Sequence, residues 1–316
     1  MHPAYSVILF TSASGAGYGL LIWLAMAWLG LLQTPQPWIA FWAAVFALAL
    51  ITVGLLASTL HLGHPERAWR AFSQWRSSWL SREGVFAVLT YPLALAFTIA
   101  WVWDGIPLVW SMVLAALLCL LCLLTVVATG MIYASLNTIP RWSNGFVVPV
   151  YLLFALSSGG LLYVLTLGLS DNPGIAIVVV PVLLLAWVVK WRYWQFIDTQ
   201  KPQSNTGTAT GLGHLGTVRQ LDAPHTSENY LLQEMGYVVA RKHSLKLRRM
   251  AMVLGMVVPA LLIVAATFIG AYAGTYVANG MFLLAAVSGF TGILIERWLF
   301  FAEARHAVTL FYGRSL

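Results

Sequence analysis

Long apolar runs dominate this sequence. Eight of them are each about 20 residues long or longer, which is the length that an α-helix needs to cross the hydrocarbon core of a bilayer. We therefore predict eight transmembrane helices. Their expected positions are 7–32, 38–60, 85–103, 109–133, 146–168, 174–191, 250–277 and 281–301.

Charged residues are too scarce to form a water-facing surface. Only 17 Lys and Arg and 10 Asp and Glu occur among 316 residues, or 9%, whereas soluble proteins carry about a quarter. This scarcity excludes a soluble fold and a disordered chain, and it argues against a nucleic-acid binder despite the net charge of +7. The chain is predicted to be an integral membrane protein.

Short polar segments separate several of the predicted helices. The segments 33–37, 104–107, 169–174 and 278–280 are too short to hold a domain, so the helices that they join form antiparallel hairpins. We therefore predict an all-α fold and treat residues 1–316 as a single polytopic membrane domain. Eight spans place both termini on the same side of the membrane.

The basic residues are confined to the side that carries the termini, which we call the basic side. The opposite side contains Asp104 and Asp171 but no Lys or Arg. Under the positive-inside rule the basic side is cytoplasmic, which predicts a bacterial cytoplasmic membrane protein with both termini in the cytoplasm. The 17 basic residues are Arg67, Arg70, Arg76, Arg82, Arg141, nine between Lys190 and Arg249, Arg297, Arg305 and Arg314.

Segment 192–249 is the only sizeable extramembrane piece. It carries more basic than acidic residues, and we expect it to dock a cytoplasmic partner through Arg219, Arg241 and Lys242. Residues 211–216 read G-L-G-H-L-G, but the polar sequence before them does not form the strand that a dinucleotide-binding site requires. We interpret this match as coincidental.

Polar residues that are costly in a bilayer cluster after the second predicted helix and before the third. His61 begins the run H-L-G-H-P-E-R-A-W, and Glu83 follows 22 residues later. A loop of this length can fold back so that both side chains face one pocket at the membrane boundary. There an imidazole can hydrogen-bond a carbonyl, and both groups can exchange protons near neutral pH.

A purely structural interpretation of these residues stays open. His61 and Glu83 can simply end helices at the interface, and His64 can serve as a loop or capping residue. Arg67 can contact lipid phosphates without any chemical role. We keep His61, His64, Arg67, Arg82 and Glu83 as candidates for ligand binding and proton transfer.

The sequence does not predict a haem or metal site formed by residues of this chain alone. All seven histidines lie at or beyond the helix ends, so no pair can hold haem at membrane depth, although a superficial haem between His61 and His306 stays open. Cys119 and Cys122 lie in an apolar run and are expected to pack there. No His or Cys cluster has zinc or iron–sulfur spacing, so no metal site is expected.

Three stretches resemble the membrane-anchor subunit family of dimethyl sulfoxide reductase. Residues 57–68, A-S-T-L-H-L-G-H-P-E-R-A, are similar to that family's A-S-x-L-H-L-G-x-P-x-R-A, and residues 80–83, L-S-R-E, to its L-S-x-E. Residues 133–142 resemble the segment after its fourth helix. The eight predicted spans also match this family, so the resemblance covers essentially the whole chain. The cytoplasmic basic side and the long 192–249 loop fit the branch that resembles the anchor of cytoplasmic sulfite dehydrogenase.

The resemblance implies an anchor and quinone-site subunit of a molybdenum oxidoreductase. Its partners would be a molybdopterin catalytic subunit and a subunit with iron–sulfur clusters, and its ligand would be ubiquinone or menaquinone. In the family, the residues that match His61 and Glu83 are linked to quinol binding, and no haem is expected. In the sulfite dehydrogenase branch, sulfite is oxidised to sulfate and the electrons enter the quinone pool.

Two other functions compete with a quinone site. In the first, the protein is a passive anchor that docks a soluble enzyme while quinone binds elsewhere. In the second, it is a small-solute transporter, for which charges at the membrane midplane are expected. Glu296 and Arg297 come closest, but they lie near the cytoplasmic end of the last helix and can simply pair.

Overall fold

The computed structural model describes residues 3–60, 63–170, 173–200, 204–222 and 239–312, with the backbone alone at 173–175, 239–242, 270, 271 and 273. Within these ranges the regular structure is helical. Eight helices are long and apolar enough to span a membrane, which confirms the predicted all-α fold with eight membrane-spanning helices.

The first six spanning helices are each continuous, whereas the seventh contains a π-helical turn. The seventh runs through α9 (Val239–Met252), the π-helical turn η4 (Val253–Val257) and α10 (Val258–Ala273). The others are α1 (Tyr5–Trp28), α2 (Pro37–Thr59), α3 (Trp79–Ala100), α4 (Leu108–Ala134), α5 (Val147–Leu169), α6 (Val179–Thr199) and α11 (Thr275–Ala302).

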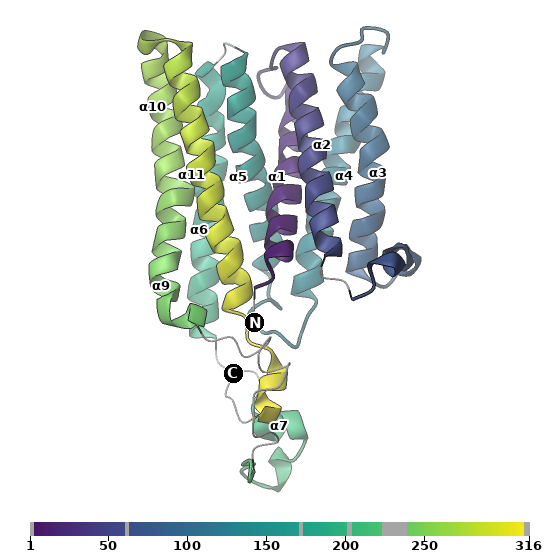
Figure 1. Ribbon diagram of the computed structural model, residues 1–316, viewed down its shortest axis with the longest axis vertical. Coiled ribbons are helices and arrows are strands. Elements are labelled where there is room, and N and C mark those ends of the chain that lie inside the picture. The colour runs from purple at the N-terminus through teal and green to yellow at the C-terminus, as the bar shows by residue number, and fades with distance from the viewer. Residues whose placement is uncertain (1–2, 61–62, 171–172, 201–203, 223–238, 313–316) are drawn as a thin grey trace.

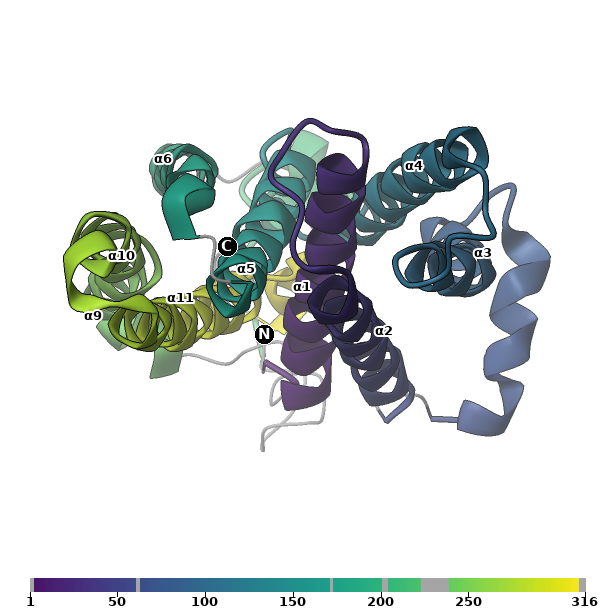
Figure 2. The same ribbon diagram turned by 90° about the horizontal axis from the view of Figure 1, so that it is seen from above.

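Helix α1 forms the centre of the bundle (Figures 1 and 2). Helices α2, α3 and α4 lie on one side of it, and α5, α6, α10 and α11 lie on the other (Figure 2). Its backbone approaches that of α5 so closely that a Cβ atom on Gly19 would lie 1.9 Å from the carbonyl oxygen of Ala155. A glycine is therefore required at this crossing.

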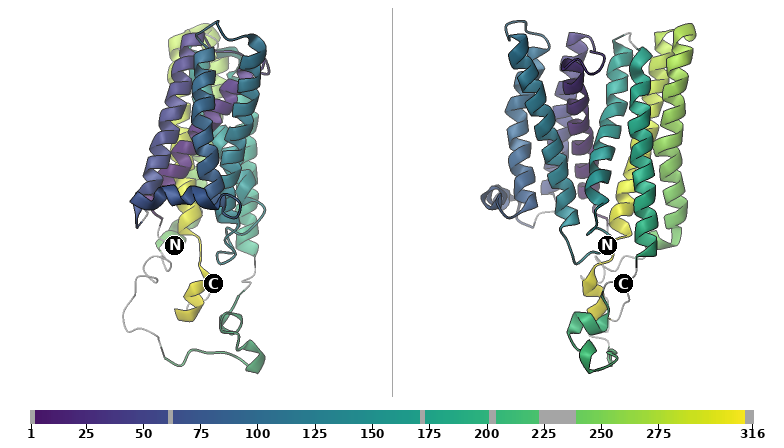
Figure 3. Two further views of the ribbon diagram at one scale, coloured as in Figure 1. Left: turned by 90° about the vertical axis from the view of Figure 1, so that its right-hand side faces the viewer. Right: turned by 180° about the vertical axis from the view of Figure 1, so that it is seen from behind.

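Both ends of the described chain lie at the same end of the bundle (Figures 1 and 3). In the described chain, four short elements outside the membrane spans share this end: η1 (Pro65–Gln74), α7 (Thr206–Thr210), η3 (Gly213–Leu215) and η5 (Ala307–Tyr312). This end corresponds to the basic side of the sequence, and the α3–α4 turn with Asp104 lies at the opposite end.

Helix α3 begins at Trp79 rather than at 85 because Ser78 caps it. The side-chain oxygen of Ser78 accepts a hydrogen bond from the backbone N–H of Ser81. The extra residues extend the helix toward the basic side. Glu83 therefore belongs to the second turn of α3, whereas the sequence alone placed it just before the helix.

Helices extend into segment 192–249 from both of its ends. Helix α6 continues to Thr199, and α9 begins at Val239. The G-x-G-x-x-G run follows the five-residue helix α7, where Gly211 adopts a left-handed conformation with φ of +71°, and it includes η3. Residues 204–222 contain no strand, so the dinucleotide-binding arrangement is absent from the part of this segment that the structure describes.

Candidate functional site

A cavity of about 600 Å³ opens between the helices at the basic side. Its walls come from α1, α2, η1, α3, α4 and α11 together with the segment after α4, so it brings together parts of the chain that are distant in sequence. His64, Arg67 and Glu83, three of the candidate residues, line it. The chain between α2 and α3 thus folds back toward the cavity that Glu83 lines, whereas His61, the other residue expected at this pocket, lies outside the described residues.

The 3₁₀ helix η1 contributes to the cavity lining at the basic side. It lies at the outer edge of the bundle, beside the end of α3 (Figures 1 and 2). The hydroxyl of Ser81 in α3 donates a hydrogen bond to the carbonyl oxygen of Ala71. Arg82 donates from Nε to the carbonyl oxygen of Trp75 at 3.0 Å and from Nη2 to that of Arg76 at 2.7 Å. These bonds fix the end of η1 against α3.

Glu83 is the most enclosed of the candidate residues. It is only 4% exposed, and the Thr129 hydroxyl of α4 donates a hydrogen bond to its Oε1 atom. The same hydroxyl lies 3.0 Å from the carbonyl oxygen of Thr125. Because a hydroxyl has one proton, Thr129 can donate to the carbonyl and accept from Glu83 when Glu83 is protonated. Both protonation states of Glu83 therefore keep a hydrogen bond.

Glu83 has no cation as a direct partner. Among the described residues, no Lys, Arg or His lies within 4.0 Å of its carboxyl oxygens. A carboxyl group with a hydroxyl partner and no ion pair can bind and release a proton without breaking a salt bridge. This distinguishes Glu83 from the paired carboxylates elsewhere in the bundle.

Aromatic side chains form one wall of the cavity. Tyr133, Trp142 and Phe301 line it. Tyr133 stacks on Tyr151 with ring centroids 5.5 Å apart and meets the rings of Trp142 and Phe301 edge to face at 5.3 and 5.4 Å. Trp142 donates from Nε1 to the carbonyl oxygen of Phe300 at 3.0 Å, which fixes its ring. The apolar faces and edges of these rings suit a planar conjugated ligand.

His64 and Arg67 occupy the solvent-exposed part of the cavity. Their side chains are 66% and 56% exposed, and His64 Nδ1 and Arg67 Nε lie 3.0 and 3.7 Å from Oε1 of Glu66. Such exposed ion pairs contribute little to stability. Arg82 does not line the cavity, because it holds the end of η1. His61 lies outside the described residues.

The predicted partner-docking residues lie in different parts of the basic side. Arg219 is exposed in the segment after η3. Arg241 and Lys242 belong to the first turn of α9, but their side chains lie outside the described part of the chain. Docking by these three residues stays a prediction.

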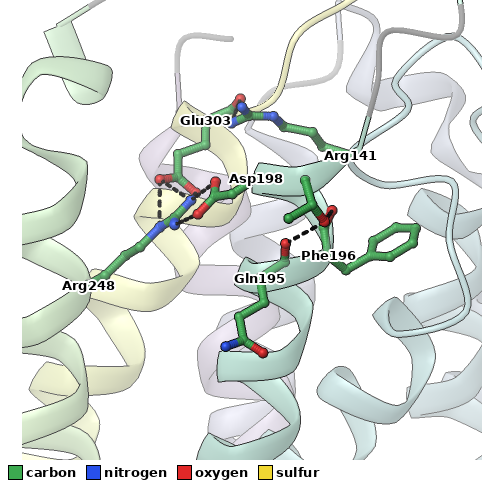
Figure 4. Close-up of polar contacts among 7 residues, drawn as sticks. Arg141, Gln195, Phe196, Asp198, Arg248 and Glu303 are labelled. Carbon is green, nitrogen blue, oxygen red and sulfur yellow. Dashed lines mark hydrogen bonds and ion pairs between the residues drawn. The ribbon is translucent and has the colours of Figure 1, made fainter.

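Arg248 of α9 joins three helices through two carboxylates (Figure 4). Its Nη1 and Nη2 atoms lie 2.5 and 3.1 Å from the carboxylate oxygens of Asp198 in α6. Its Nε and Nη2 atoms donate to Glu303, which follows α11, at 3.0 Å each. Arg141 adds a bond of 2.9 Å from Nη1 to the backbone carbonyl of Glu303. The guanidinium of Arg248 thus stabilises this end of the bundle.

A second charged cluster is buried between α6 and α11. Lys190 Nζ lies 2.5 Å from Oε1 of Glu296, and both side chains are 0% exposed. Arg297 Nε lies 3.5 Å from Oε2 of Glu296, and its guanidinium lies 3.9 Å from the centroid of the Tyr151 ring. The sequence interpretation allowed Glu296 and Arg297 to pair with each other, but it missed Lys190. The sequence signal for this pair was one acidic and one basic residue in two predicted spans, Lys190 in 174–191 and Glu296 in 281–301.

The fold and the cavity define a class of protein. This is a polytopic helical membrane protein with a cavity that joins a buried carboxyl group, an aromatic wall and an opening toward water on the basic side. Such a cavity can hold a planar ligand with polar groups and exchange protons with one side of the membrane.

Comparison with known proteins assigns the family. The DMSO reductase anchor subunit (DmsC) family matches residues 1–314, so the chain belongs to this family and is an anchor subunit of a multi-subunit membrane oxidoreductase. It is 31% identical over 329 aligned positions to a sulfite dehydrogenase subunit of Allochromatium vinosum, with 99% of each chain covered. It is 26% identical over 165 positions to the anaerobic dimethyl sulfoxide reductase chain YnfH of Escherichia coli, which covers 50% of this chain and 55% of that one. The resemblance read from the sequence is confirmed.

Proposed function

We propose that this subunit binds a quinone in the cavity at the basic side and connects the quinone pool to iron–sulfur clusters of a partner subunit. The observation that carries the proposal is the position of Glu83, a buried carboxyl group that forms no ion pair with the described residues, in a cavity that is open toward water. Membership of the DmsC family supports it, because these anchors belong to molybdenum and iron–sulfur enzymes that react with quinone.

The shape and chemistry of the cavity suit a quinone head group. A volume of about 600 Å³ falls within the usual range for small-ligand sites. Tyr133 and Trp142 offer flat aromatic surfaces, while Glu83 provides a polar group on the α3 side. His61 is proposed to hydrogen-bond one carbonyl of ubiquinone or menaquinone, on the basis of the sequence motif.

Glu83 would supply a proton to the bound ligand. Reduction of a quinone to a quinol takes up two electrons and two protons, and a full negative charge on a buried oxygen is costly. Proton transfer from a positioned carboxyl group avoids that charge. The Thr129 hydroxyl keeps a hydrogen bond to Glu83 before and after the transfer. Arg82 fixes the adjacent η1 end, and Arg67 is close enough to the opening to attract negative charge.

Protons would be exchanged with the basic side. His64 and Arg67 form the exposed part of the cavity lining, so water can approach Glu83 from that direction. The positive-inside rule makes this side cytoplasmic. If the substrate is also oxidised there, turnover moves no net charge across the membrane.

The partners and the substrate follow from the relatives. We propose a molybdopterin catalytic subunit and an iron–sulfur subunit, docked on the basic side by Arg219, Arg241 and Lys242 of segment 192–249. Sulfite is the proposed substrate, because the chain resembles the sulfite dehydrogenase subunit of Allochromatium vinosum along 99% of its length. The catalytic subunit would oxidise sulfite to sulfate, and this chain would deliver the electrons to quinone.

The decisive experiment compares Glu83→Gln with Asp104→Asn in the intact complex. The first variant removes the proton donor from the cavity, whereas the second makes the same carboxyl-to-amide change on an exposed residue at the opposite end. We expect Glu83→Gln to lower quinone reductase activity by about 10²–10⁴-fold, the usual contribution of general acid–base catalysis. Reduction of a water-soluble artificial acceptor by the partner subunits should not change.

His61→Leu provides an independent test of the carbonyl contact. It should raise the KM for quinone or abolish quinone reduction, again with normal activity toward the artificial acceptor. A passive anchor gives the opposite result. Quinone reduction would be normal in the Glu83 and His61 variants, and the soluble partner enzyme would lose its attachment to the membrane only when segment 204–222 is deleted. That outcome would overturn the proposal.

A further inference from the structure

A second, much smaller chamber lies beside Thr129, the hydrogen-bond partner of Glu83. It has a volume of about 10 Å³ and is enclosed by α1, α4, α5 and α11. A polar cavity needs roughly 10–15 Å³ and two to four hydrogen-bonding partners to hold one water molecule. The chamber has this size, and its polar lining consists of Thr11, Ser12, Ser14, Tyr18, Thr129, Tyr151, Ser158 and Arg297.

Four polar atoms of the chamber lack protein partners. The hydroxyls of Ser12, Tyr18 and Tyr151 and Nη1 of Arg297 are buried, and none has a hydrogen-bond partner among the described residues. Buried polar groups without a protein partner are normally satisfied by an ordered water. Arg297 can donate to such a water, and the three hydroxyls can donate or accept.

Thr129 connects this chamber with the proposed quinone site. Its side chain lines the chamber, and its hydroxyl donates the hydrogen bond to Glu83. A water between Thr129 and Arg297 would therefore complete a polar path from the Glu83 carboxyl group to the buried charges of α6 and α11.

The buried charges at the far end of this path are not balanced. Lys190 and Arg297 are cations, and Glu296 is the single carboxylate that pairs with them, so the three residues carry a net charge of +1. A positive charge in a medium of low dielectric constant stabilises an anion at a distance more strongly than it would in water.

We propose that the chamber binds one ordered water, which joins Thr129 to Arg297 and allows the net positive charge to stabilise the carboxylate that forms when Glu83 gives its proton to the quinone. Arg297 is then a positioning residue that acts on Glu83 through the water. The role in turnover rests on the proposed function of Glu83, whereas the electrostatic link exists in the resting protein.

Among the described residues, other ionisable groups around Glu83 do not replace Arg297. The surrounding tyrosines are neutral at neutral pH, and the described part of α2 contributes only hydroxyl and apolar groups to the cavity. Arg67 is exposed, and Glu66 offsets its charge. The described groups that face Glu83 from neighbouring elements are Tyr18 of α1, Tyr133 of α4, and His64 and Arg67 of η1.

Infrared spectroscopy of the intact complex in native membranes without added quinone tests the link directly. Glu83→Gln identifies the carboxyl band of Glu83, whose intensity is then followed against pH. Charges separated by a hydroxyl and a water, roughly 9 Å, interact by about one pH unit at an effective dielectric constant of about 20. We expect Arg297→Gln to move the midpoint of the Glu83 band upward by about that amount.

The double variant Lys190→Leu/Glu296→Leu is the matched control. It removes one cation and one anion and leaves the net charge at +1, so the midpoint should move by less than about a third of that shift. If the carboxyl band does not titrate in the accessible pH range, its frequency at neutral pH is compared between the variants instead. Loss of the water should change this frequency, because it changes the hydrogen bond of Thr129 to Glu83.

A second pair of variants tests the water without altering charge. Ser12→Val fills the chamber. Ser12→Ala removes one hydroxyl but leaves the chamber open, with Tyr18, Thr129 and Arg297 still available to bind the water. The Val variant should therefore shift the Glu83 band, and the Ala variant should shift it much less. The proposal is refuted if Arg297→Gln and Ser12→Val both leave the midpoint and the frequency of the Glu83 band unchanged. It is also refuted if Lys190→Leu/Glu296→Leu, which keeps the net charge, shifts the band as much as Arg297→Gln does. Because no quinone is present, these outcomes are independent of whether Glu83 protonates it.

Discussion

The buried pair of Lys190 and Glu296 makes a sharp stability prediction. Both side chains are 0% exposed, and their charged atoms lie 2.5 Å apart between α6 and α11. Removing one partner of a buried ion pair typically costs about 3–5 kcal/mol, because the other charge stays buried without compensation. Replacing both partners of an isolated pair by apolar residues of similar volume costs far less.

The two single substitutions should not cost the same. Glu296→Leu leaves Lys190 and Arg297 as two buried cations, so we expect a loss of about 4 kcal/mol in the free energy of unfolding. Lys190→Leu leaves Glu296 beside Arg297, 3.5 Å from Nε, which limits the loss to about 2 kcal/mol. The double variant should lose about 3 kcal/mol, because Arg297 stays buried without its carboxylate partner, and this is still less than the two single losses together.

Unfolding of the full-length chain in mixed micelles by added sodium dodecyl sulfate measures these differences. The 15 tryptophans provide the fluorescence signal. Glu66→Gln is the exposed control, because its pairs with His64 and Arg67 lie in water and should contribute less than about 1 kcal/mol. If the losses in the single variants simply add in the double variant, the two residues do not form a coupled buried pair, and the reasoning is wrong.

Two further predictions concern the basic side. Arg248→Met should lower the free energy of unfolding by about 3 kcal/mol because two carboxylates lose their shared cation, whereas Arg249→Met, at an exposed neighbour, should have little effect in the same unfolding assay. Burial lowers the pKa of His306, and its neutral Nδ1 accepts the backbone N–H of Val308 at 3.0 Å. This stabilisation is complete above about pH 6.5 and is lost as the pH falls through the lowered pKa. Amide exchange at Val308, corrected for its intrinsic pH dependence, should therefore accelerate in acid, and His306→Asn should remove the effect.

The membrane fold could be predicted because the bilayer imposes it on local sequence. A run of about 20 apolar residues such as 109–133 must form a helix when it crosses a medium in which backbone groups have no water to bind. The boundaries were less predictable. Ser78 moves the start of α3 to Trp79, and a single capping hydrogen bond of this kind leaves only a weak trace in the sequence.

Part of the candidate site was also visible in the sequence. The sequence predicted that His61 and Glu83 face one pocket, and it kept His64 and Arg67 as further candidates. His64, Arg67 and Glu83 line the cavity, whereas His61 lies outside the described residues. The hydrogen bond of Glu83 to Thr129 was not predictable, since Thr129 lies 46 positions away on another helix. Its partner depends on how α3 and α4 pack.

The sequence by itself determined the eight spans, the separation of charge between the two sides and the membership of the anchor family, because hydrophobic length, loop charge and motif residues are properties of the chain alone. Only the tertiary structure decided which charges neutralise one another. Lys190 and Glu296 are more than one hundred positions apart, and whether they pair depends on the rotation and depth of α6 and α11 in the bundle. In a medium of low dielectric constant this pairing decides whether a buried charge stabilises or destabilises the fold, and a linear sequence does not specify it.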